Sequence, residues 1–333
     1  MSITTEPVPA IATGQDNPVP SVRSTLLHAL VAAFMFVSPL ILFVPATLLN
    51  SGLRNGWKGV WGALLGGVAL LGVVAAAASR PGQLPGQISG AARLLFEVGI
   101  PTLVVFAMIR QRFRFGPVLL AALGSGIVGF LLTELVMRAG FSHSPYSMLV
   151  DNFRRDTLRS FDFYQKAGMP ADALAIMKSL SEGIASTYMP FLLIVITVTM
   201  FLLSLLMVSR LPAGRATGSS YFFRNLVLPD ALLFGFVAGG LAPLASGTIR
   251  SLGLNLLATV GFLYFLQGLA ILRFMLVSVK AGFFAMAVAF GVVTLLTLYG
   301  VAPFLLFLAG LFDPFFDFRH FNKKDDANES HID

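Results

Sequence analysis

The chain of 333 residues contains no cysteine, which excludes disulfides, thiolate metal ligands and thiol nucleophiles. Its histidines are dispersed and form no HExxH motif, so we expect no metal site. A P-loop is also absent, which excludes ATP hydrolysis by that route, and no GxSxG motif indicates a hydrolase nucleophile. We therefore expect no cofactor and no enzymatic activity. An intramembrane enzyme remains an alternative that no motif supports.

Charge is scarce as well, because only 12% of the residues are charged while 56% are hydrophobic. Soluble domains carry roughly 25% charged residues, and a chain this apolar needs lipid as its solvent. The formal net charge is +7, but the basic residues are scattered between hydrophobic runs. This pattern is typical of membrane topology and not of a nucleic-acid surface. We predict the lipid bilayer as a partner and no nucleic acid.

Hydrophobic runs long enough to cross a bilayer as helices occur eight times. They lie near residues 25–49, 57–79, 90–109, 117–138, 187–209, 229–249, 253–278 and 281–299, and a shorter apolar piece follows at 301–312. Backbone groups in lipid must be paired internally, and no alternating strand pattern is present. The predicted fold is all-α, a polytopic transmembrane bundle of about eight spans.

The two ends of the chain differ from the bundle, which we place at residues 23–312. Residues 1–22 are rich in proline and small residues without helical periodicity, which predicts a disordered tail. A cleavable signal peptide is not evident, since the first apolar run begins late and is too long. Residues 313–333 are predicted to form an interfacial helix and a polar tail.

Basic residues in alternate short loops predict the orientation. One side holds Arg54, Lys58, Arg110, Arg112, Arg114, Arg210, Arg215, Arg224, Arg273 and Lys280; the other holds Arg80, Arg93 and Arg250. We expect the first set inside. The N-terminus is then outside, unless the proline of Ser38-Pro39 breaks the first run into a hairpin. The C-terminal tail is inside only if 301–312 turns back as a short re-entrant segment, which Gly300 and Pro303 permit.

The long connection 139–186 is predicted to be extracytoplasmic. Apolar residues such as Leu149 and Phe153 recur there at helical spacing among charged residues, and a second such stretch follows Met169-Pro170. This pattern predicts two amphipathic helices. They are interpreted as a lid packed on the protein, a layer on the membrane face or a substrate gate.

Polar side chains at membrane depth are candidates for function by default. Glu97 is central in its span, with Arg93 and Pro101 four residues away on either side. It is a candidate for ligand or proton binding, with Pro101 freeing a backbone carbonyl; the alternative is an ion pair with Arg93. Gln267 and Arg273 are further ligand candidates. Their alternatives are an interhelical hydrogen bond and anchoring to headgroups, and their spacing puts them on different faces.

Other pairs are predicted to have structural roles. Glu134 precedes Arg138 by one turn, the favourable order for a helical ion pair. Small residues spaced four apart allow close helix packing or docking of a partner. These pairs are Ala29 and Ala33, Ala122 and Gly126, and Gly235 and Gly239.

The stretch GLFDPFFDFRH, residues 310–320, follows the last apolar run. Asp313 and Pro314 are typical of a helix start, and Arg319 is expected to reach for lipid phosphates. An acidic pair formed by Asp313 and Asp317 is the alternative. The stretch resembles the C-terminal signature of the YybS-like family, uncharacterised integral membrane proteins of bacteria. Residues 190–211, 224–240 and 255–274 resemble that family in order and spacing, and 94–114 is the best fit in the N-terminal half.

This resemblance implies a bacterial cytoplasmic (inner) membrane protein without an assigned activity. The family is distantly similar to substrate-binding subunits of energy-coupling vitamin transporters, in which Ala29 and Ala33 would dock a partner subunit. We therefore expect a protein that binds or moves a small solute, with any ATPase supplied by a partner. The alternative is a membrane scaffold for envelope or signalling proteins.

Overall fold

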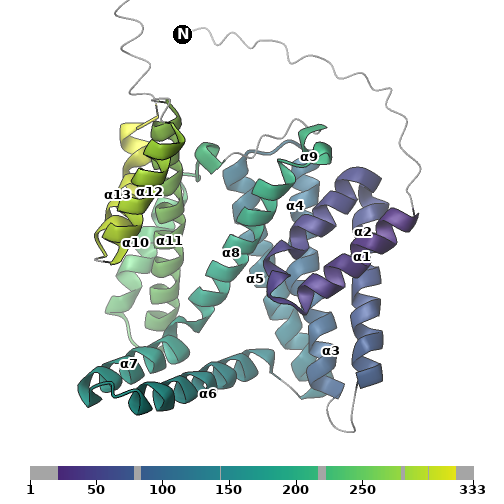
Figure 1. Ribbon diagram of the computed structural model, residues 1–333, viewed down its shortest axis with the longest axis horizontal. Helices are drawn as coiled ribbons and strands as arrows, with labels where there is room; N and C mark the ends of the chain where they lie inside the picture. The colour runs from purple at the N-terminus through teal and green to yellow at the C-terminus, as the bar shows by residue number, and fades with distance from the viewer. Residues whose placement is uncertain are drawn as a thin grey trace, which may run out of the picture.

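The computed structural model describes residues 22–78, 84–142, 144–216, 223–278, 282–298 and 300–319, and this part of the chain contains helices and no strand. Five segments are long and apolar enough to cross a membrane: Pro39–Ala77, Ile88–Arg110, Phe115–Phe141, Ala171–Val208 and Gly247–Ser278. Shorter apolar helices cover Val22–Phe36, Leu232–Leu244 and Val301–Phe316. Figure 1 shows two groups of helices on either side of α8, with α6 and α7 across one end. The predicted all-α architecture is confirmed.

The first hydrophobic run is broken at its proline. Helix α1 (Val22–Phe36) ends there, and a 3-10 turn (Pro39–Phe43) leads into α2 (Val44–Ala78). The hydroxyl of Ser38 accepts a hydrogen bond from the Leu40 N–H and so caps the turn. Because Pro39 has no backbone N–H to donate, the helix breaks here and the chain can reverse.

The two arms of this break pair antiparallel. The His28 ring lies 3.1 Å from the Asn50 side-chain amide, and Asn55 donates to Thr25 over 3.5 Å. Helix α2 then turns at Gly56, whose φ of 66° and ψ of −157° suit glycine. The start of α1 therefore lies beside the end of the first arm of α2. The hairpin alternative holds, and the N-terminal end of α1 is on the side of the Arg54 loop, predicted to be cytoplasmic.

The central part of the chain follows the hydrophobic pattern closely. It contains α3 (Leu84–Arg93), a π-helical turn (Leu94–Gly99), α4 (Ile100–Arg110), α5 (Phe115–Phe141), α6 (Pro145–Lys166), α7 (Ala171–Gly183), a second π-helical turn (Ile184–Tyr188), α8 (Met189–Val208) and α9 (Pro212–Ala216). The connection between α5 and α8 is thus two helices, as its amphipathic pattern predicts. Arg154 of α6 binds Glu182 of α7 through two hydrogen bonds, of 2.5 and 3.2 Å.

The run at 229–249 is not one helix. A 3-10 turn (Phe223–Asn225) and an irregular stretch from Leu226 to Pro229 precede it. The run itself contains α10 (Leu232–Leu241), another 3-10 turn (Ala242–Leu244) and the start of α11 at Gly247. Leu226 and Leu228 are buried, so irregular backbone packs against the bundle. The residue before a proline avoids helical dihedrals, which explains why the helix starts only after Pro229.

The chain ends with three helices: α11 (Gly247–Ser278), α12 (Phe283–Leu298) and α13 (Val301–Phe316). Helix α13 crosses α11 closely at glycines, because a Cβ added at Gly310 would lie 1.9 Å from the Tyr264 carbonyl oxygen. The prediction that Asp313 and Pro314 start a helix is wrong. Both lie in the last turn of α13, which ends at Asp317 in a left-handed conformation. Proline lacks a backbone N–H, and in the last turn of a helix this loss affects only one hydrogen bond.

Candidate functional site

A groove with a volume of about 500 Å³ lies between α5 and α8, close to the start of α6. Most of its wall is apolar. Its lining residues are Glu97, Leu123, Gly126, Ile127, Phe130, Leu131, Glu134, Arg138, Tyr146, Pro190, Leu193, Ile194, Thr197 and Leu252. Two carboxylates that the sequence analysis treats as separate features, those of Glu97 and Glu134, therefore face one space. We call this space the lateral groove.

Glu97 lies in the π-helical turn that precedes Pro101. Its Oε2 atom accepts a hydrogen bond from Arg93 Nε over 3.1 Å, so the pairing expected as an alternative is present. Its Oε1 atom is buried within the protein and is not exposed to the groove. The Thr133 hydroxyl lies close enough to interact with Glu97 and donates to the Gly129 carbonyl over 3.0 Å. The structure thus has the ion pair, and the partly exposed Glu97 side chain also lines the groove.

Helix α5 holds the turn around Glu97 in place. A Cβ at Gly129 would lie 2.1 Å from the Phe96 carbonyl oxygen, so only glycine allows the backbones to approach this closely. Pro101 is buried, and the adjacent Thr102 donates to the Val98 carbonyl over 2.6 Å. Single π-helical turns inside helices frequently occur at functional sites, and this one directs a carboxylate into a cavity.

A second π-helical turn, Ile184–Tyr188, precedes Pro190 on the opposite wall of the groove. Asn255 of α11 pairs the backbone there: its side chain donates to the Thr187 carbonyl over 2.8 Å and accepts from the Phe191 N–H over 3.0 Å. Each π-helical turn is thus followed by a proline. Pro190 and Asn255 are not among the residues predicted from the sequence, although a proline after an amphipathic stretch was a usable signal.

Glu134 does more than form its predicted ion pair with Arg138, whose Nε lies 2.5 Å away. Its carboxylate also accepts hydrogen bonds from the Ser144 hydroxyl and, over 3.1 Å, from the Tyr146 N–H. Ser144 is the N-cap of α6, so Glu134 ties the start of α6 to the rim of the groove. Burial raises the pKa of the Tyr146 hydroxyl, which keeps this group a protonated donor at the groove.

Gln267 is buried in α11 far from the lateral groove, and its side chain makes interhelical hydrogen bonds. Its Oε1 accepts from the Leu228 N–H over 3.1 Å, and its Nε2 donates to Asp313 Oδ2 over 2.9 Å. Leu228 is a buried residue of the irregular stretch from Leu226 to Pro229, and a buried backbone N–H there needs a hydrogen-bond partner. Gln267 therefore stabilises this unwound segment.

Arg319 completes the same network. Its Nε lies 3.6 Å from Asp313 Oδ2, and its Nη1 and Nη2 donate to the carbonyls of Arg224 and Leu226 over 2.8 and 2.6 Å. The expectation that Arg319 reaches for lipid phosphates is wrong, because its guanidinium donates to the backbone carbonyls of Arg224 and Leu226. We call Gln267, Asp313 and Arg319 the C-terminal clamp. Asp317 lies next to it as the exposed residue that ends α13.

The remaining predicted residues lie elsewhere. Ala29 and Ala33 are buried in α1, and a Cβ at Gly66 of α2 would lie 2.9 Å from that of Ala29. Gly235 and Gly239 of α10 face α11, where a Cβ at Gly239 would lie 2.8 Å from the backbone nitrogen of Leu257. These small residues pack against helices of the same chain. Arg273 lines a separate cavity at the end of α8.

No group of three His, Asp or Glu side chains comes together as metal ligands in the part of the chain that the structure describes. The fold and the groove define a polytopic α-helical membrane protein with a polar site open between two helices. The chain belongs to the family of predicted membrane proteins described as DUF2232, whose model matches residues 24–314. The resemblance to YybS-like proteins is consistent with this family. No curated protein and no solved structure matches the chain.

Proposed function

We propose that this protein binds a small amphiphilic solute in the lateral groove and takes part in its movement across a bacterial inner membrane. The observation that supports the proposal is the position of the Glu97 carboxylate: its side chain lines the groove and is 18% exposed, and Arg93 pairs only with its Oε2 atom. A solute with an apolar body and one N–H or O–H group would cover the apolar wall and donate a hydrogen bond to this carboxylate. A cationic amine would also add attraction to the carboxylate.

The position of α6 suggests how occupancy of the groove is coupled to movement. Glu97 and Glu134 line the same space, and Glu134 holds the first residues of α6. A solute group that donates to Glu134 in place of the Ser144 hydroxyl or the Tyr146 N–H would loosen this link at one end of α6. Helix α6 then acts as a gate on the predicted extracytoplasmic side. Nucleotide hydrolysis, where transport requires it, would come from a partner protein.

The experiment is ligand extraction from protein purified in mild detergent, followed by mass spectrometry of the released small molecules. Ile127 and Val128 are neighbours on α5 with similar exposure, 43% and 50%, and of the two only Ile127 lines the groove. We expect a molecule that co-purifies with the wild type and the Val128→Trp variant but is depleted about tenfold in Ile127→Trp and Glu97→Gln, the loss of one charge-assisted hydrogen bond. Equal recovery from all four proteins would rule out the groove as the binding site.

The scaffold function has one observation in its favour, an apolar surface on the α6–α7 layer. Leu158, Phe163, Ile176 and Leu180 are each more than half exposed there. Such a surface can bind another protein or lie on lipid. If the protein is a scaffold, deleting residues 145–184 would abolish the binding of partner proteins, whereas Glu97→Gln would leave them bound.

A further inference from the structure

The charged and apolar residues of the lateral groove are separated along its length. Its wall on α5 extends from Leu123 to Arg138, which are fifteen positions, or about 22 Å, apart along the helix. Gly129 lies against the π-helical turn that carries Glu97. The charged lining residues, Glu97, Glu134 and Arg138, all lie from this level toward the start of α6. We call this part the outer half of the groove and the rest its inner half.

The inner half is apolar, and the groove is open to the side along α5. Ile127 of α5 and Leu193 of α8 line the inner half, and the Thr197 hydroxyl donates to the Leu193 carbonyl over 2.9 Å within its own helix. Ile127 and Leu131 line the groove and are also 43% and 59% exposed, so this wall continues into the outer surface of α5. Because α5 is one of the long apolar spans, a bilayer would cover that surface with acyl chains. The groove thus opens laterally toward lipid.

In the outer half, the negative charges are less exposed than the positive charges that pair with them. The side chains of Glu97 and Glu134 are 18% and 14% exposed, whereas those of their partners Arg93 and Arg138 are 42% and 62% exposed. Solvent and salt screen exposed charges much more than partly buried ones. Glu134 also lies close enough to act on Glu97 by charge repulsion. The outer half therefore favours a cation over an anion, although both carboxylates are paired.

A primary ammonium group fits the outer half by its charge and its donors. It has three N–H donors, and each carboxylate oxygen has more than one acceptor site, so the carboxylates of Glu97 and Glu134 can keep their arginines. An apolar chain attached to the ammonium group would extend past Ile127 into the inner half. The volume of about 500 Å³ is that of a site for a drug-sized ligand, which favours a single chain over a whole diacyl lipid.

We propose that the substrate of the lateral groove is a primary-amine amphiphile with a single apolar chain, which enters sideways from the bilayer. Its ammonium group binds between Glu97 and Glu134, and its chain lies between α5 and α8 toward the bilayer centre. This inference rests on the proposed function, because it assigns a substrate class to the same groove.

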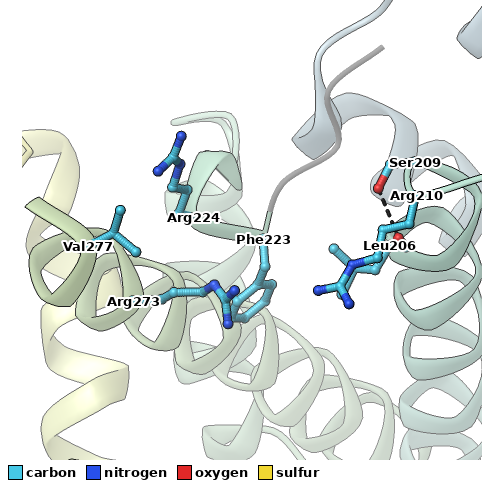
Figure 2. Close-up of a pocket in the computed structure, with 7 residues that line it drawn as sticks. All are labelled: Leu206, Ser209, Arg210, Phe223, Arg224, Arg273 and Val277. Atoms are coloured by element: carbon cyan, nitrogen blue, oxygen red, sulfur yellow. Dashed lines mark hydrogen bonds between the residues drawn. The ribbon is translucent and has the colours of Figure 1, made fainter. Parts of the chain in front are cut away.

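The cavity at the other end of α8 provides an internal comparison. Its volume is about 320 Å³, and its charged lining residues are Arg210, Arg224 and Arg273, which Figure 2 shows. None of the described residues that line it is acidic. An ammonium group finds no carboxylate among them, so selection for an amine would report binding in the lateral groove.

The test is equilibrium binding of radiolabelled dodecylamine to the full chain in phosphatidylcholine nanodiscs, with empty nanodiscs as the background. We expect saturable binding to the wild type and about tenfold weaker binding to Glu97→Gln and to Glu134→Gln, the loss of one charge-assisted hydrogen bond each. Glu182→Gln is the matched control, because Glu182 also pairs with an arginine on the same predicted side and does not line the groove. It should bind dodecylamine as the wild type does.

Competition by unlabelled amphiphiles with the same dodecyl chain tests the head group without any mutation. Dodecanol and dodecanoate should compete at least about tenfold more weakly than dodecylamine, because they lack the cationic donor. Dodecyltrimethylammonium should be intermediate, since it keeps the charge without N–H groups. Equal competition by all of them would overturn the proposal, and so would equal losses of binding in Glu97→Gln and Glu182→Gln. An unfolding curve for each variant verifies that lost binding does not reflect a lost fold.

Two further variants separate failure of this inference from failure of the proposed function. Ile127→Trp fills the lateral opening and should abolish dodecylamine binding, whereas Val128→Trp should preserve it. If Ile127→Trp alone weakens binding but the head groups compete equally, the amine assignment is wrong and the groove remains a binding site. If no saturable binding occurs, this inference is overturned, while solute extraction still tests the groove without assuming a head group. If Ile127→Trp changes neither dodecylamine binding nor solute recovery, both proposals are wrong.

Discussion

Two buried carboxylates in this protein, those of Glu97 and Asp313, look alike by their local chemistry. Each has one oxygen that pairs with an arginine, and each has a second oxygen that is buried. Their surroundings differ. Asp313 also accepts a hydrogen bond from Gln267, and its ion-pair partner Arg319 donates to the backbone carbonyls of Arg224 and Leu226. Glu97 lies in a π-helical turn and lines a cavity.

This difference shows how to interpret an ionisable group in a membrane protein. Placing an ionisable group at membrane depth costs free energy, so other interactions must offset that cost. In the C-terminal clamp, the offsetting interactions are hydrogen bonds to backbone groups that would otherwise lack partners, which is a structural role. Glu97 satisfies no such backbone, and its side chain lines a groove that a ligand could fill. The cavity, more than the burial of the charge, distinguishes the functional candidate.

The largest effect that separates the two sites is expected from Arg319→Met. Removing one member of a buried ion pair typically costs about 3–5 kcal/mol of folding free energy. Here the carbonyls of Arg224 and Leu226 also lose their donor. We expect a much lower unfolding midpoint in detergent or bicelles, measured by intrinsic fluorescence.

The control for this change is Arg154→Met, which removes another paired arginine. Arg154 and Glu182 lie on the exposed α6–α7 layer, where solvent screens an ion pair and it contributes little to stability. If Arg319→Met were no more harmful than Arg154→Met, the clamp would not be the structural element described here.

Gly129→Ala should have a smaller but distinct effect on the lateral groove. The added methyl group would overlap the Phe96 carbonyl oxygen and force the π-helical turn away from α5. Overpacking of this kind typically costs about 1–3 kcal/mol. Because the turn carries Glu97, recovery of the co-purifying solute should fall together with stability.

The matched control is Gly124→Ala on the same helix, where an added Cβ meets nothing within 4 Å. That variant should be as stable as the wild type or slightly more stable, since alanine is the better helix former. Equal behaviour of the two variants would mean that the close approach at Gly129 does not position the turn.

Much of the fold follows from the sequence, because long apolar runs have few alternatives in lipid. The long spans, the two amphipathic helices and the break at Ser38-Pro39 all depend on local pattern and proline chemistry. The end of α10 was also encoded locally, in the proline of Ala242-Pro243-Leu244, but the hydrophobicity of the run 229–249 concealed it. Local reasoning was wrong for Asp313 and Pro314, since the tertiary hydrogen bond from Gln267 to Asp313 and the ion pair of Asp313 with Arg319 override the preference of these residues for a helix start.

The groove was only partly predictable. Glu97 and Glu134 stand out because charge is rare in the spans, but nothing in their spacing of 37 positions indicates that they face one cavity. That depends on how α5 crosses the π-helical turn at Gly129. The partners of Glu134, Ser144 and Tyr146, belong to the connection after α5, so a helical ion pair was the limit of what sequence could suggest.

The smallest expected effect is on the stability of Glu97→Gln, and it provides the sharpest test of the contrast with Asp313. The change removes a helical ion pair worth about 0.3–0.5 kcal/mol, while an uncharged amide is less costly to bury than a carboxylate. Arg93 is 42% exposed and can turn toward the headgroups. We therefore expect an unfolding midpoint close to that of the wild type. Asp313→Asn, by contrast, leaves Arg319, which is 12% exposed, without its counter-ion and should be clearly destabilised. Equal stability losses in the two variants would show that Glu97 is as structural as Asp313 and would remove the main support for a ligand in the lateral groove.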